Sequence, residues 1–204
     1  MSPSTWASIA IAGVASHLSL FALLHWFEPQ LSPKASIISD YGETASSFVA
    51  TTAFFAFAAI WLALAIALRS ASPHNLFLAS GRALLLLAVV GITTGALVSG
   101  TADPRTGSIL AKLQSIVARP GLFLGIILVS IGLRSTKGWG DIWPILLALS
   151  LVAAAMLPIT IALMLERGLG GVGQRLIFVL VYAWAVLVAL RILASPRRSE
   201  PLQQ

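Results

Sequence analysis

The chain has 204 residues, of which 58% are apolar and only 10% are charged. Soluble domains carry about 45–50% apolar and about 25% charged residues, so this composition excludes a soluble enzyme, a disordered chain and a nucleic-acid-binding protein. The net charge of +6 is typical of a membrane protein whose cytoplasmic loops collect Lys and Arg, and the absence of cysteine excludes disulfides, thiolate metal sites and thiol nucleophiles.

The apolar residues form segments of the length that a membrane-spanning helix requires, about 20 residues. Residues 6–27, 45–68, 83–102 and 143–165 meet this requirement. Two further segments, 120–133 and 176–190, are shorter, and each becomes long enough if a flanking arginine extends its side chain to the membrane surface. We therefore predict an all-α bundle of six transmembrane helices in one domain, residues 1–195, followed by a short polar tail, residues 196–204.

Proline and glycine mark the boundaries of these segments. Pro120 and Pro144 suit the first turns of the fourth and fifth helices, whereas Pro158 lies inside the fifth. The glycine-rich residues 168–173 predict a flexible turn before the sixth helix. Residues 108–118 carry apolar side chains at near-helical spacing, which fits either a short amphipathic helix on the membrane surface or an extension of the fourth helix.

The distribution of basic residues bears on the orientation, because Lys and Arg gather on the cytoplasmic side. An even number of helices places both termini on one side. Seven basic residues fall on that side and six on the other: Arg69, Arg82, Arg134, Lys137, Arg191, Arg197 and Arg198 against Lys34, Arg105, Lys112, Arg119, Arg167 and Arg175. The pair Arg197 and Arg198 favours cytoplasmic termini, in the plasma (inner) membrane of the cell. Four tryptophans lie at helix ends, whereas Trp61 and Trp184 lie further inside and are expected to pack in the bundle.

Two small-residue motifs predict close helix contacts. Gly91 and Gly95 form one GxxxG pattern, and Gly121 and Gly125 form another. These glycines fit packing inside the bundle, or contacts in a homo-oligomer or a larger membrane complex. The other expected partners are membrane lipids; no nucleic acid is expected.

His17 lies near the middle of the first helix, where even a neutral imidazole needs hydrogen-bond partners. It is either a structural histidine bonded to a Ser, Thr or Tyr hydroxyl or a functional group. The three histidines have no carboxylate at ligand spacing, so we predict neither a metal site nor a cofactor.

A second set of polar residues falls on the side opposite the termini. It comprises Asp40, Tyr41, Asp103, Arg119, Gln174 and Arg175. Helix capping and structural ion pairs explain such residues, and so does a polar pocket that binds a ligand. We expect at least one acid–base pair of the set to be in contact, because a charge near hydrocarbon is stabilised by an opposite charge. The sequence contains no recognisable catalytic motif.

Three short motifs occur in order along the chain: Ile38-Ser39-Asp40-Tyr41-Gly42, Thr101-Ala102-Asp103-Pro104 and Gly173-Gln174-Arg175. In this order the chain resembles the domain of unknown function 998 family, small multi-pass membrane proteins of bacteria and archaea. The resemblance covers nearly the whole chain and implies a membrane fold without an established reaction. The chain departs from the family pattern at Leu113-Gln114-Ser115, where members commonly carry a histidine, and at Ser99-Gly100, where they often carry an aromatic-proline pair.

These observations favour an integral membrane protein with a non-enzymatic role. It would bind a lipid or another hydrophobic ligand, or serve as an accessory subunit of a membrane assembly. The alternative is a hydrolase-like intramembrane enzyme, or a transporter of protons or small solutes, that uses His17 and the carboxylates of the outer side.

Overall fold

A computed structural model describes residues 1–70, 75–98 and 104–195, which form helices and loops without a strand. The six long helices are α1 (Pro3–Phe27), α2 (Ser47–Ala67), α3 (Leu76–Val98), α4 (Pro104–Leu133), α5 (Trp143–Arg167) and α6 (Gly170–Ala194). Two short 3₁₀ helices are η1 (Ile38–Glu43) and η2 (Leu68–Ser70). Each long helix contains a segment that is long and apolar enough to cross a membrane, so the predicted six-helix fold is confirmed.

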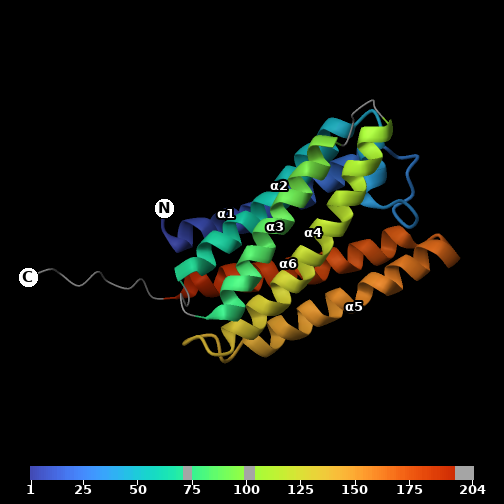
Figure 1. The fold of residues 1–204 in the computed structure, drawn as a ribbon. Coiled ribbons are helices and arrows are strands. Elements are labelled where there is room, and N and C mark those ends of the chain that lie inside the picture. The colour runs from blue at the N-terminus through green and yellow to red at the C-terminus, as the bar shows by residue number, and fades with distance from the viewer. Residues whose placement is uncertain (71–74, 99–103, 196–204) are drawn as a thin grey trace, which may run out of the picture.

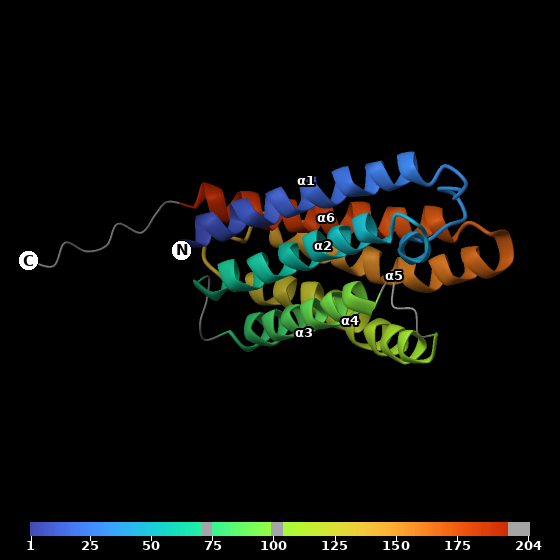
Figure 2. The same ribbon diagram turned by 90° about the horizontal axis from the view of Figure 1, so that it is seen from above.

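The helices pack in chain order, and α6 closes the arrangement by contacting α1 as well as α5 (Figure 1). The start of α1 and the end of α6 lie at the same end of the bundle, which we call the terminal end (Figures 1 and 2). The opposite end, which we call the far end, carries η1 and the connection between α5 and α6. The first and the last helix therefore begin and end, respectively, at the same end of the bundle.

Small residues bring α3 and α4 into close contact. A Cβ atom at Gly91 would lie 2.9 Å from the backbone nitrogen of Ala118, and one at Gly121 would lie 3.0 Å from a carbonyl oxygen of α3. Gly125 also faces α3, and Gly95 is buried. For Gly91, Gly121 and Gly125, packing inside the bundle is confirmed, while a role in oligomers stays a prediction.

Two helix boundaries differ from the sequence prediction. α3 begins at Leu76 rather than at residue 83. The charged Arg82 does not end the helix, because its Nε donates a hydrogen bond to the Ala65 carbonyl at 2.9 Å. α4 runs without interruption from Pro104, so residues 108–118 extend the fourth helix and do not form a separate surface helix. Pro120 accordingly lies inside α4 and not in its first turn. Pro144 in the first turn of α5 and Pro158 in its interior are confirmed.

The predicted flexible turn at residues 168–173 is wrong for residues 170–173, because α6 begins at Gly170. The first backbone N–H groups of a helix have no partner within the helix. Here Gly171 and Val172 donate theirs to the carbonyls of Ala35 and Lys34, each at 3.2 Å. The loop after α1 thus satisfies the start of α6 and holds the glycines in helical conformation.

The two inner tryptophans pack in the core, as predicted. Both Trp61 and Trp184 are fully buried, and their ring centroids lie 6.2 Å apart. Trp184 Nε1 donates to the Ser130 hydroxyl of α4 at 2.9 Å, which joins α4 to α6 near the middle of the bundle.

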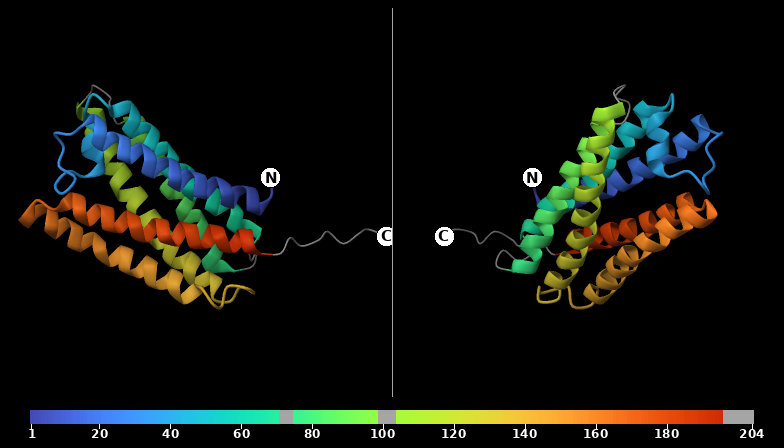
Figure 3. Two further views of the ribbon diagram at one scale, coloured as in Figure 1. Left: turned by 180° about the vertical axis from the view of Figure 1, so that it is seen from behind. Right: turned by 45° about the vertical axis from the view of Figure 1, so that its right-hand side comes forward.

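α4 and α5 are close at the terminal end and separate towards the far end (Figures 1 and 3). Their connecting loop is held at the terminal end by the ion pair between Arg191 and Asp141, at 3.0 Å, and by the guanidinium of Arg134, which lies 5.3 Å from the ring centroid of Trp143. The candidate site lies between α4 and α5, where the two helices separate.

Candidate functional site

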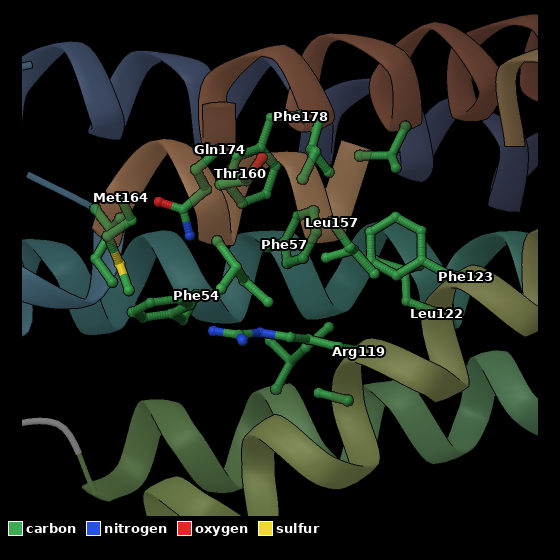
Figure 4. A pocket seen from close by; sticks show the side chains of 16 residues that line it. Phe54, Phe57, Arg119, Leu122, Phe123, Leu157, Thr160, Met164, Gln174 and Phe178 are labelled. Atoms are coloured by element: carbon green, nitrogen blue, oxygen red, sulfur yellow. The ribbon is translucent and has the colours of Figure 1, made fainter. Parts of the chain in front are cut away.

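A cavity of about 360 Å³ lies between α2, α4, α5 and α6 towards the far end of the bundle (Figure 4). Small-molecule sites in proteins typically measure about 300–1,000 Å³, so this cavity is large enough for a ligand. It is lined by Ile37, Phe54, Phe57, Ile92, Ala118, Arg119, Leu122, Phe123, Leu157, Thr160, Ile161, Met164, Gln174, Ile177, Phe178 and Val181.

Only three of these lining residues are polar or charged, and each comes from a different helix. They are Arg119 of α4, Thr160 of α5 and Gln174 of α6. In Figure 4 the Arg119 side chain extends along the cavity towards Phe54. Within the described part of the chain, Arg119 makes no hydrogen bond or ion pair.

Gln174 and Thr160 are held in place by their neighbours. Gln174 Oε1 accepts a hydrogen bond from the Ile38 backbone nitrogen at 2.7 Å, which leaves its amide nitrogen without a partner among the described residues. Thr160 lies against α6, where a Cβ atom at Gly173 would come within 2.6 Å of its hydroxyl oxygen. That hydroxyl is buried and has no hydrogen-bond partner in the described structure.

Arg175 follows Gln174 in α6 and holds the loop after α1. It donates to the carbonyls of Ser36, at 3.2 Å, and Gly171, at 2.8 Å, and to His25 Nε2 at 2.8 Å. The other ring nitrogen of His25 lies 2.7 Å from the Phe21 carbonyl. Since a carbonyl only accepts, His25 carries its proton on Nδ1, and its Nε2 is the acceptor for Arg175.

The remaining residues of this loop are fixed by local contacts. Asp40 accepts a hydrogen bond from the Ile37 backbone nitrogen at 2.8 Å, and Tyr41 is fully buried in η1. Burial raises the pKa of the Tyr41 phenol, and the nearby charge of Arg175 opposes that shift. Glu28 accepts a hydrogen bond from the Ser46 backbone nitrogen at 3.0 Å, and hydrogen bonds from Ser46 and Thr44 lower the pKa of its carboxyl group.

The polar residues singled out in the sequence therefore divide into two groups. Asp40, Tyr41 and Arg175 lie in or against the loop after α1, Arg119 lines the cavity, and Gln174 contacts both. Asp103 lies outside the described residues. Among the described residues, Asp40 forms no ion pair with Arg119 or Arg175, because Arg175 is bonded to carbonyls and His25, and Asp40 to backbone. Whether Asp103 contacts either arginine falls outside the described part of the chain.

His17 is buried, but its partner differs from the prediction. Its Nδ1 lies 2.9 Å from the Ala53 carbonyl of α2, not from a hydroxyl, because α1 and α2 pack closely here and a helix carbonyl retains a second lone pair. In the part of the chain that the structure describes, Nε2 has no partner and no carboxylate contacts the ring. Phe57 and Phe178 contact the imidazole and also line the cavity, so these rings separate His17 from it. The described residues contain no group of three or more His, Asp or Glu that could hold a metal.

The cavity itself was not apparent from the sequence. Apolar residues such as Phe54, Leu157 and Met164 look the same in the sequence whether their side chains pack against a neighbouring helix or line a cavity. Thr160 lies two residues after the internal Pro158, which was its only local signal. The contact of His25 with Arg175 was missed because 150 positions separate the two residues.

The comparisons with known proteins agree with the fold. Residues 11–191 match the family described as protein of unknown function (DUF998). The chain belongs to this family. Two of the three motifs that carry the resemblance meet in space, since Ile38 of the first is bonded to Gln174 of the last. No curated protein and no solved structure matches the chain.

Proposed function

We propose that this multi-pass membrane protein binds a lipid or a similar hydrophobic ligand in the cavity between α4 and α5, without catalysing a reaction. The observation that carries the proposal is the cavity itself, apolar over most of its lining and with three polar side chains gathered in it. A mainly apolar pocket with a few converging polar groups is the usual form of a small-molecule site.

The position of the cavity supports a ligand that comes from the bilayer. Among the lining residues, Arg119, Ile161 and Met164 are the exposed ones, and they belong to α4 and α5. The cavity therefore opens between these two helices, on the side of the bundle that faces lipid. We further propose that the protein resides in the plasma (inner) membrane with both termini cytoplasmic, so that the cavity lies in the outer half of the bilayer.

A matched pair of substitutions in α5 tests the proposal. Ile161 lines the cavity and Ile159 does not, although their side chains are exposed to nearly the same extent, 49% and 48%. We expect Ile161→Trp to fill the opening and reduce the amount of lipid that remains bound to the purified protein in native mass spectrometry. Ile159→Trp adds the same ring to the same helix and should leave bound lipid unchanged.

Equal lipid retention by the two variants and the unmodified protein would contradict the proposal. A comparison of thermal unfolding midpoints in detergent shows whether each variant is folded before its lipid content is measured.

A further inference from the structure

We infer that the cavity selects lipids with an anionic head group, which the guanidinium of Arg119 recognises. This inference rests on the proposed function, because it names the class of ligand for the same cavity. It requires that the ligand carry both an apolar chain and a negative charge.

The first argument is the hydrogen-bonding capacity that the protein leaves open. The Arg119 guanidinium offers only donors, and none is used within the described structure. The Gln174 oxygen is bonded to the Ile38 backbone nitrogen at 2.7 Å, so the free part of this amide is its NH₂ group, again a donor. A ligand that brings acceptors fits both groups.

The second argument is charge. Among the described residues that line the cavity there is no carboxylate, and Arg119 is the one that carries a charge; the others have apolar, hydroxyl or amide side chains. A charge within a membrane-spanning segment is costly unless it is paired, and Arg119 lies in the part of α4 that is apolar enough to cross a membrane, with no partner among the described residues. The forked guanidinium matches phosphate and carboxylate oxygens in pairs, so an anionic head group is the ligand chemistry that offsets this cost.

The third argument is the shape of the opening. Arg119 lies at the exposed edge of the cavity together with Ile161 and Met164, while aromatic rings from α2, α4 and α6 close the inner side. A lipid held by its head group at Arg119 can therefore leave its chains between α4 and α5 in the bilayer. A free anion such as inorganic phosphate would leave the apolar lining without a contact.

The test compares lipids that differ only in head group. Binding of dioleoyl phosphatidylglycerol, which is anionic, and of dioleoyl phosphatidylcholine, which is zwitterionic, is titrated by native mass spectrometry with the full-length protein in detergent. We expect the anionic lipid to bind more tightly, and Arg119→Gln to lose roughly tenfold or more of that affinity while the zwitterionic lipid changes little. Arg119→Lys, which keeps the charge without the fork, should fall between the two.

Arg167→Gln is the matched control, because Arg167 is exposed at the far end of α5 and does not line the cavity. It removes the same charge and should retain the head-group preference. Arg119→Gln should unfold in lipid-free detergent at a temperature no lower than the unmodified protein, since no described residue forms a hydrogen bond or ion pair with this charge; if it cannot be purified, Arg119→Lys carries the test.

The results that would overturn the inference differ from those that would overturn the proposed function. Equal affinity for the two lipids, or unchanged selectivity in Arg119→Gln, would overturn the inference while leaving lipid binding intact. Displacement of the lipid by sodium phosphate alone would show an anion site that needs no chain and would also overturn it. Failure of both lipids to bind would remove the proposed function as well.

Discussion

At the scale of single residues, two polar side chains of this bundle are bonded to backbone carbonyls of a neighbouring helix. His17 contacts the Ala53 carbonyl and Arg82 the Ala65 carbonyl, each at 2.9 Å. Every carbonyl in a helix keeps a second lone pair after its helical hydrogen bond, so close helix packing supplies acceptors without any polar side chain. For this reason the hydroxyl partner that the sequence predicts for His17 is wrong.

Trp184 and Ser130 form a buried hydrogen bond between two side chains. The Ser130 hydroxyl accepts the indole N–H of Trp184. We predict that Ser130→Ala lowers the free energy of unfolding by about 1–3 kcal/mol, because it leaves the Trp184 N–H buried without a partner. The measurement is denaturant-induced unfolding in mixed micelles, followed by tryptophan fluorescence.

Ser150→Ala serves as the control for this prediction. Ser150 is also fully buried, but its hydroxyl is bonded only to the Leu147 carbonyl of its own helix, at 2.9 Å. Its removal should have a clearly smaller effect. If both serine substitutions lower the free energy of unfolding by the same amount, the bond to Trp184 stabilises the protein no more than a hydroxyl bond within one helix.

At the scale of the elements, the start of α6 is a binding surface for the loop after α1. Its backbone N–H groups bond the carbonyls of Ala35 and Lys34, Arg175 bonds the Ser36 carbonyl, and Gln174 bonds Ile38. This arrangement needs glycine at 171, since a Cβ atom there would lie 2.5 Å from the Pro33 oxygen. The glycine-rich segment therefore serves close approach rather than flexibility.

We predict that Gly171→Ala destabilises the protein by about 1–3 kcal/mol, because the added methyl group forces the loop away from α6. Unfolding in detergent measures the loss, and increased protease cleavage within residues 28–37 should accompany it as the loop is released.

Gly140→Ala is the matched substitution, because nothing lies within 4 Å of the corresponding Cβ position and its φ is not positive. It should be near neutral. A similar loss of stability in both variants would mean that the effect of Gly171→Ala is not the clash with the loop.

At the scale of the whole molecule, composition and segment length were sufficient to predict the fold. Apolar runs of about 20 residues have few structural alternatives in a membrane, so six helices followed directly. The boundaries of α3 and α4 were harder, because arginines within a helix look like helix ends until their partners are known, as Arg82 illustrates. The cavity depends on how far α4 and α5 diverge, and no residue pattern in either helix encodes that divergence on its own.

The fold does not determine the orientation of the protein in the membrane. The orientation depends on a small difference in the number of basic residues on the two sides. The structure places the start of α1 and the end of α6 at one end, but seven basic residues against six decide weakly which side that end faces. The outer position of the cavity depends on this orientation, since Arg119 and Gln174 lie towards the far end.

We predict that the terminal end is cytoplasmic, and the cysteine-free chain makes the test direct. Lys137 is exposed in the loop at the terminal end, and Arg167 is exposed at the far end of α5. In Lys137→Cys and Arg167→Cys, each cysteine is the only one in the chain, so a membrane-impermeant maleimide reports its side without background from the unmodified protein. Arg167→Cys should react in right-side-out vesicles and Lys137→Cys in inverted ones. The reverse pattern would place the cavity in the cytoplasmic half of the bilayer, and reaction of both cysteines from the same side would contradict the six-helix topology.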